Sequence, residues 1–232
     1  PHIEYELRDH FKFEVPNAKF MPQYRGRNWN GEIHLFDMRS KQIYVGLLDK
    51  IVNFCNQYGY TYKFEDNKFY GTPYEENDRI SFEGVKDYMS SICSHSPRKY
   101  QIEGVYGALK HNRKLLISPT ASGKSLMIYS LVRYYVDQGQ KILLVVPTTS
   151  LVEQMYKDFQ DYGWNADSYC HRIYSGKEKS NDAPVTITTW QSVYKLERSF
   201  FEDYNVVIGD EAHLFKSKSL ISIMTKLHHA KY

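Results

Sequence analysis

The stretch 114–125, with the sequence KLLISPTASGKS, constrains the fold of this 232-residue chain more than any other stretch. An apolar run over 115–117 leads into a loop of small residues, and a helical pattern follows from Leu126. A strand, a tight loop and a helix in this order form a cradle in which backbone N–H groups and the helix N-terminus bind anionic oxygens. The stretch therefore predicts a phosphate-binding loop. The alternative is a small-residue turn that only joins a strand to a helix.

The residues of this loop have separate predicted tasks. Lys124 would reach the β- and γ-phosphates of a nucleotide, and the Ser125 hydroxyl would bind Mg²⁺. The strict pattern begins with a glycine, and Ser118 stands at that position here. The residues predicted to contact the nucleotide are Ser118, Pro119, Thr120, Ala121, Ser122, Gly123, Lys124 and Ser125.

A second motif, VVIGDEAH over 206–213, places two carboxylates at the end of an apolar run. Nucleotide hydrolysis needs a carboxylate at a strand end to hold Mg²⁺, and Asp210 is predicted to do this. It also needs a carboxylate that orients or deprotonates the attacking water, and Glu211 is predicted to do that. Lys124, Asp210 and Glu211 are thus the predicted catalytic residues. The alternative is an acidic turn after a core strand.

The apolar pattern predicts two domains with a boundary at about residue 95. In residues 95–232 helices alternate with nearly continuous apolar strands, which is typical of a doubly wound parallel sheet in an α/β fold. The predicted helices are 98–110, 124–137 and 149–161, and the predicted strands are 114–118, 141–147, 171–175, 185–189 and 205–209.

Residues 1–94 are predicted to form a small α/β domain. Its predicted elements are a helix within 1–15, an extended stretch 18–37 with a hairpin turn at Asn30-Gly31, a helix 43–58, a short strand 60–64, a polar hinge 65–80 and a helix 81–92. The pair Asn-Gly is a strong signal for a tight hairpin turn.

Charge and hydropathy narrow the class of partner. No apolar run approaches the roughly 20 residues of a membrane helix. Residues 1–94 carry a net charge of −2 and residues 95–232 a net charge of +5, which suits an anionic partner of the second domain. Lys19, Arg25, Arg27, Arg39 and Lys41 surround aromatic residues on or beside the predicted hairpin. Cations can hold phosphates and aromatics can stack on bases, although an ordinary packed hairpin is the alternative.

Five motifs together resemble superfamily 2 DNA and RNA helicases and translocases. They are KYQIEGV (99–105), SPTASGKS (118–125), VVPTTSLVEQ (145–154), TTWQS (188–192) and DEAH (210–213). The resemblance implies a RecA-like domain that uses ATP and Mg²⁺, with Gln101 contacting the adenine base. It also implies nucleic-acid contacts by Pro147, Thr148, Thr149, Thr189 and Gln191. Ala121 departs from the glycine common in this family, but its small side chain still allows the loop to close around phosphate.

Nearly the whole chain is also similar to the UvsW family of recombination helicases from T4-type phages. The stretches ELRDHFKFE, RNWNGEIHLFD and VGLLDKIVNFC carry this resemblance in the first domain. It implies a monomeric helicase acting on branched or duplex DNA and RNA–DNA hybrids in the cytoplasm of an infected bacterium, alongside single-strand-binding or recombination proteins. Arg25, Arg27 and Trp29 would then help to grip DNA.

Two other functions remain open from the sequence. One is an ATP-switched nucleic-acid-binding protein that separates no strands, and the other is an RNA helicase. A second RecA-like domain with an arginine finger is expected after Tyr232. The chain by itself is therefore expected to bind ATP weakly and to hydrolyse it slowly.

Overall fold

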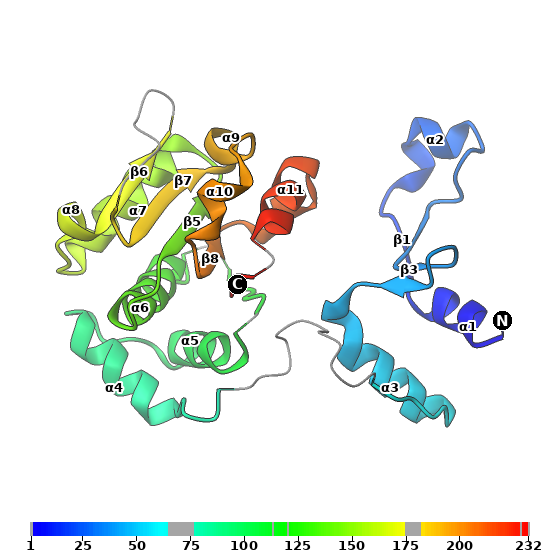
Figure 1. The fold of residues 1–232 in the computed structure, drawn as a ribbon, viewed down its shortest axis with the longest axis horizontal. Helices are drawn as coiled ribbons and strands as arrows, with labels where there is room; N and C mark the ends of the chain where they lie inside the picture. The colour runs from blue at the N-terminus through cyan, green and yellow to red at the C-terminus, as the bar shows by residue number, and fades with distance from the viewer. Residues whose placement is uncertain are drawn as a thin grey trace. The chain divides into compact units, whose positions relative to one another are not determined.

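A computed structural model describes residues 2–64, 77–112, 114–119, 121–174, 182–227 and 229–231. The chain forms two compact units, 1–71 and 72–232 (Figure 1). Thr120 of the predicted loop lies outside the described residues, as do residues 65–76 of the predicted hinge. None of the helices within the described ranges is long and apolar enough to cross a membrane.

The second unit is built on a parallel sheet of four strands in the order β6-β7-β5-β8. The strands are β5 (Ile142–Val146), β6 (Cys170–Ile173), β7 (Val185–Thr189) and β8 (Val206–Gly209). The helices are α4 (Phe82–Ile92), α5 (Lys99–His111), α6 (Lys124–Asp137), α7 (Thr149–Asp161), α8 (Ala166–Tyr169), α9 (Trp190–Val193), α10 (Arg198–Glu202) and α11 (Lys218–Lys226), with a 3₁₀ turn η3 (Ala212–Lys216). The predicted α/β fold with a doubly wound parallel sheet is confirmed.

The central strand β5 shows why both faces of this sheet need a cover. All five of its residues are buried. Ile142, Leu144 and Val146 belong to one core with α4, α5, α6 and α7. Leu143 and Val145 belong to a second core with residues of α9, α10 and α11. Because successive side chains of a strand point to opposite faces, an unbroken apolar run fills two cores at once.

The predicted strand 114–118 is wrong. These residues have no strand conformation, and Leu115 and Ile117 are 65% and 93% exposed. A strand needs a hydrogen-bonded neighbour, and the free edge of β8 is bridged by Lys231 instead. The Val207 amide donates to the Lys231 carbonyl at 2.8 Å, and the Lys231 amide donates to the Asn205 carbonyl at 2.9 Å. The loop at 118–125 therefore follows an extended segment that lies outside the sheet.

The first unit contains short elements around a small aromatic core. They are α1 (His2–His10), β1 (Lys12–Glu14), η1 (Ala18–Phe20), α2 (Pro22–Arg25), β2 (Glu32–His34), β3 (Phe36–Asp37), β4 (Gln42–Ile43), η2 (Val45–Leu47) and α3 (Leu48–Tyr58). The strands form two antiparallel pairs, β1 with β2 and β3 with β4. Phe54 of α3 is buried at the centre and contacts the rings of Phe11, Tyr58 and Tyr60.

The predicted tight hairpin at Asn30-Gly31 is wrong. The partner of β2 is β1, and the connection 15–31 between them contains η1 and α2. Gly31 has φ +87°, and its carbonyl accepts a hydrogen bond from the Val15 amide at 2.8 Å. The glycine thus closes a long connection, because the residues before it form a short helix and not a strand.

The predicted strand 60–64 is also wrong, since none of these residues is in a strand. The Tyr60 amide donates to the Cys55 carbonyl at 2.8 Å, beside Gly59, which ends α3 with φ +71°. Because the Tyr60 amide is used to cap α3, it cannot donate a hydrogen bond to a neighbouring strand.

The helix α4 packs within the second unit. It contacts α5 and α6, and Val85 and Met89 lie in the core that those helices share with the sheet. The compact units accordingly divide at 71/72, whereas the sequence places the boundary near 95. The reason is that the apolar face of α4 packs against α5.

Candidate nucleotide site

The phosphate-binding loop has a left-handed backbone at two positions. Gly123 has φ +75° and immediately precedes α6, so that Lys124 is the first residue of the helix. Ala121 has φ +61°, a conformation that costs an alanine about 1–2 kcal/mol relative to the right-handed region. The glycine common at this position in helicases would avoid that cost. Ser118 and Ser122 hydrogen-bond each other through their hydroxyls across the loop.

Two residues of α5 hydrogen-bond the backbone of this loop. The Gln101 side-chain amide donates to the Ser122 carbonyl at 3.0 Å, and its oxygen accepts from the Arg98 amide at 2.8 Å. The Tyr100 hydroxyl donates to the same Ser122 carbonyl at 2.7 Å. A Cβ on Gly123 would lie 2.5 Å from the Gln101 side-chain nitrogen, so a larger residue there would displace the Gln101 carboxamide. Gln101 is 5% exposed, and its carboxamide is engaged by the loop.

The two predicted motifs meet in the fold. Lys124 Nζ lies 3.4 Å from Glu211 Oε1, although 87 residues separate them. Glu211 has φ +54° and also pairs with His213 Nδ1 at 3.2 Å. Both side chains of the Lys124–Glu211 pair are a little more than one third exposed, so the pair is open to solvent. The structure thus brings an ammonium and a carboxylate to the mouth of the phosphate-binding loop.

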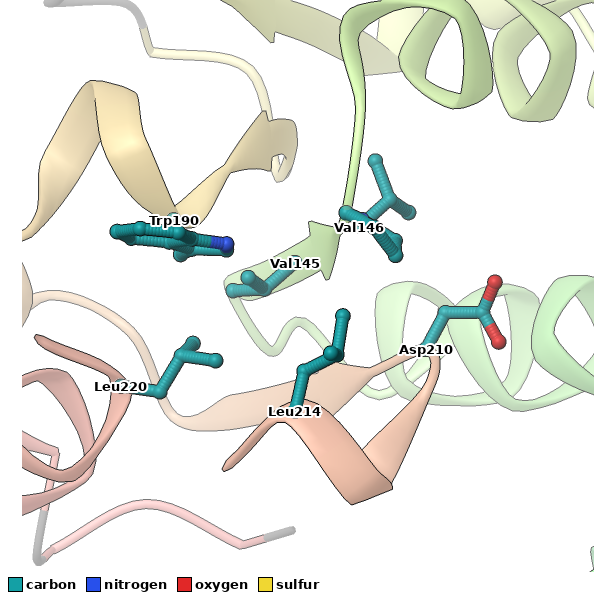
Figure 2. A pocket seen from close by; sticks show the side chains of 7 residues that line it. Val145, Val146, Trp190, Asp210, Leu214 and Leu220 are labelled. Atoms are coloured by element: carbon teal, nitrogen blue, oxygen red, sulfur yellow. The ribbon is translucent and has the colours of Figure 1, made fainter. Parts of the chain in front are cut away.

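Asp210 lies next to Glu211, just beyond the carboxyl end of β8. Its backbone amide donates to the Val145 carbonyl at 2.9 Å, which continues the sheet pairing for one residue. Figure 2 shows its carboxylate pointing away from the apolar side chains of Val145, Trp190, Leu214 and Leu220. One carboxylate oxygen accepts from the Glu211 amide at 2.9 Å.

Within the described part of the chain, no hydrogen bond joins the Ser125 side chain to Asp210. Its hydroxyl lies 2.9 Å from the Tyr162 hydroxyl, at the end of α7. Burial raises the pKa of Tyr162, and the hydrogen bond with Ser125 opposes the shift. Burial also raises the pKa of Asp158, again opposed by a hydrogen bond with Ser125. Tyr162 and Asp158 of α7 lie outside every motif, and Tyr100 lies inside the motif 99–105 but had no predicted role. Tertiary packing brings all three residues to the site.

The residues present fit a magnesium nucleotide by their chemistry. A hydroxyl and carboxylates are oxygen donors, which Mg²⁺ prefers, and Lys124 supplies a cation for phosphate oxygens. Among the described residues there is no preformed group of three His, Cys, Asp or Glu side chains around a cation position. Mg²⁺ in nucleotide sites is commonly bound by one or two side chains together with phosphates and water.

The predicted nucleic-acid residues of the second unit lie at one edge of the sheet. Pro147, Thr148 and Thr149 follow β5, Gln191 follows β7, and the strand ends Val146 and Thr189 are register partners. The side chains of Thr148, Thr149 and Gln191 are exposed. The Thr148 hydroxyl caps α7 by accepting from the Leu151 amide at 3.3 Å. Thr189 is buried, and its hydroxyl lies 2.9 Å from that of Ser192, so its side chain is part of the fold.

The predicted nucleic-acid residues of the first unit lie on the connection 15–31, which has three cations and no carboxylate. Arg25 ends α2, Arg27 follows with φ +56°, and both are exposed. Trp29 is half-buried, and its indole N–H donates to the Glu32 carbonyl at 2.6 Å. A shallow groove beside them is lined by Val15, Met21, Gln23, Asn28, Trp29 and Ile33.

An α/β unit in which the lysine of a Gly-Lys-Ser loop pairs with the Glu of a DEAH sequence is typical of the P-loop class of nucleotide-binding proteins. Within it, the chain belongs to the family described as type III restriction enzyme, res subunit, which matches residues 94–232. Residues 1–65 match the family described as DNA helicase UvsW, N-terminal. The resemblances stated from the motifs are thereby confirmed.

The chain is homologous to the ATP-dependent DNA helicase UvsW of enterobacteria phage T4. The two are 34% identical over 239 residues, which cover 98% of this chain and 46% of the relative. A crystal structure of T4 UvsW superimposes with a TM-score of 0.78 at 33% identity, covering 98% of this chain and 47% of that one. The DNA 3′-5′ translocase XPB2 of Sulfurisphaera tokodaii is 29% identical over 160 residues, 68% of this chain and 33% of the relative. The chain thus spans about half the length of the T4 relative, or less in the case of XPB2.

Replacing Gln101 tests what its carboxamide does. Because the carboxamide joins α5 to the loop, we expect Gln101→Ala to weaken ATP and GTP binding by similar factors of about 5 to 10, the size of one or two hydrogen bonds. The measurement is nucleotide titration by calorimetry. A loss confined to ATP would show instead that Gln101 contacts the adenine base. Asn112→Ala, at the far end of α5, serves as the control.

Proposed function

We propose that this chain is the nucleotide-binding part of an ATP-dependent DNA helicase or translocase. The observation that carries the proposal is the 3.4 Å ion pair between Lys124 and Glu211, which joins the phosphate-binding loop to the DEAH sequence. The similarity to T4 UvsW along 98% of the chain supports it. We further propose that the complete protein unwinds or branch-migrates branched DNA and R-loops in phage recombination, repair and replication control.

Each residue has a defined part in this proposal. Lys124 leaves Glu211 and binds the β- and γ-phosphates, while the backbone N–H groups of 121–124 surround the phosphate oxygens. Ser125 and Asp210 hold the magnesium ion, which when bound neutralises charge on the phosphates. Glu211, released from Lys124, accepts a proton from the attacking water. Gln101 either contacts the adenine base or holds the loop, as the titration above decides.

The nucleic acid is proposed to cross the edge of the sheet where β5 and β7 end. Exposed Thr148, Thr149 and Gln191 can donate hydrogen bonds to backbone phosphates there, and such contacts position a strand without reading its sequence. Thr189 and Pro147 support this edge. In the first unit, Arg25, Arg27 and Trp29 are proposed to grip duplex or branched DNA.

The surroundings in the cell follow from the same proposal. The protein would act as a monomer in the cytoplasm of an infected bacterium, on DNA or an RNA–DNA hybrid, next to single-strand-binding or recombination proteins. The test is ATP hydrolysis by the complete protein with and without forked DNA, together with release of a labelled strand from the fork. ATP binding without hydrolysis or strand release would favour an ATP-switched binding protein, and activity confined to RNA would favour an RNA helicase.

Removing the two arginines of the first unit tests its grip on DNA. Each phosphate contact contributes about −0.9 to the slope of log K against log salt on duplex DNA. We therefore expect Arg25→Ala/Arg27→Ala to lower affinity for forked DNA and to flatten this slope by up to about two units. The measurement is fluorescence anisotropy over a series of salt concentrations.

A variant with the same loss of charge is the control for this experiment. Lys50 and Lys63 are exposed cations of the same unit outside the connection 15–31. Lys50→Ala/Lys63→Ala should leave the slope nearly unchanged. If both double variants bind forked DNA like the wild type, the grip lies at the sheet edge around Thr148 and Gln191.

A further inference from the structure

The Ser125 hydroxyl is held on the α7 side of the nucleotide site. It lies 2.9 Å from the Tyr162 hydroxyl. A serine hydroxyl has one proton and two lone pairs, so the contact with Tyr162 uses its donor or one of its acceptor positions.

Tyr162 is fixed well enough to keep this contact in place. Its ring centre lies 5.0 Å from that of Tyr129 and 5.9 Å from that of His95, and its side chain is half-buried. Its backbone amide donates to the Asp158 carbonyl at 2.9 Å, which continues α7. Tyr129 is itself anchored, because its hydroxyl donates to the Ile92 carbonyl at 2.9 Å. The Tyr162 hydroxyl is therefore presented to Ser125 by a rigid aromatic cluster.

A magnesium ion held by Ser125 and Asp210 would use the same Ser125 oxygen as a ligand. A hydroxyl that turned toward Asp210, beyond the end of β8, would lose its hydrogen bond with Tyr162 at the end of α7. We propose that Tyr162 is a positioning residue that holds Ser125 away from the metal in the nucleotide-free protein and so lowers the affinity for the magnesium nucleotide. This inference rests on the proposed nucleotide site.

The proposal predicts a gain of affinity when the Tyr162 hydroxyl is removed. Tyr162→Phe keeps the ring and loses one hydrogen bond, so we expect Mg·ADP to bind about 3 to 10 times more tightly, the value of one net hydrogen bond. ADP in EDTA should bind equally to wild type and variant, because Ser125 acts on the metal. In the absence of nucleotide the variant should melt at a slightly lower temperature. Calorimetric titration of the 232-residue chain, with and without Mg²⁺, measures both affinities.

Three variants separate this effect from a loosened core. Tyr129→Phe removes a neighbouring hydroxyl that bonds Ile92 and not Ser125, and it should not tighten binding. In a Ser125→Ala background, Tyr162→Phe should have no effect. Tyr162→Met also removes the hydroxyl that contacts Ser125 and should shift Mg·ADP affinity in the same direction, which tests the proposal even if Tyr162→Phe does not fold.

The outcomes distinguish this inference from the proposed function. Equal Mg·ADP affinity of wild type and Tyr162→Phe would overturn the inference and leave the proposed function standing. A gain that persists in EDTA, or one shared by Tyr129→Phe, would also overturn it. If the wild type binds no nucleotide at all, the proposed function falls and the inference falls with it.

Discussion

Lys124→Ala is expected to abolish measurable ATP binding. The ammonium is the cation that reaches the loop, and a hydrogen bond to a charged group contributes about 1.5–3 kcal/mol, or roughly 10- to 150-fold in affinity. For a site that binds ATP weakly, such a loss moves the dissociation constant beyond the range of calorimetry. Titration of the wild type and the variant with Mg·ATP measures the difference.

The control for this variant is another lysine of the same stretch. Lys114 is exposed and lies ten residues before Lys124, so Lys114→Ala removes an equal charge outside the loop. It should bind ATP like the wild type. Stability is also informative, because exposed ion pairs contribute about 0–1 kcal/mol and loss of the Lys124–Glu211 pair should change the melting temperature little. Unchanged ATP affinity in Lys124→Ala would show that the loop does not bind phosphate through this residue.

Glu211→Gln is expected to separate nucleotide binding from hydrolysis. The amide keeps the shape of the carboxylate but cannot take a proton from water. In the complete protein we expect ATP to bind and turnover to fall by about 10²–10⁴, the usual contribution of a general base. Steady-state hydrolysis with forked DNA, compared with ATP affinity, measures the two effects separately.

Two results would assign the role of Glu211 elsewhere. Turnover within a factor of a few of the wild type would show that another group orients the water. A parallel loss of ATP affinity would show that Glu211 acts through the loop, to which it is joined by Lys124. Glu197→Gln, which precedes α10 and lies outside both motifs, is the control for the chemical change itself.

Several features could be predicted because they depend on residues close together in the chain. The helices α6 and α7 begin and end within a residue of the predicted bounds, since apolar periodicity and terminal signals lie inside each segment. The continuous apolar runs of β5 and β7 predicted buried parallel strands, because such runs are stable only between two layers. Gly123, Lys124 and Glu211 could be predicted as site residues because loop and strand-end chemistry requires those residue types at those positions.

Other features depended on partners far away in the sequence. Residues 115–117 are as apolar as a strand, but no neighbouring strand pairs with them, and Leu115 and Ile117 stay exposed. The pairing of β1 with β2 across 15–31 replaced the local hairpin that Asn30-Gly31 favours. A strand exists only when a second segment supplies hydrogen bonds, and one segment's composition cannot specify that.

The site divides in the same way. The sequence by itself determined which groups are predicted to carry the chemistry, namely the ammonium of Lys124, the hydroxyl of Ser125 and the carboxylates of Asp210 and Glu211. Tertiary structure alone decided what those groups contact. It placed Lys124 in an ion pair with Glu211. It also placed the Gln101 side chain in hydrogen-bond contact with the loop, and the Ser125 hydroxyl in hydrogen-bond contact with Tyr162. Side-chain direction follows from how helices pack on one another, and that packing is a property of the whole core and not of any single motif.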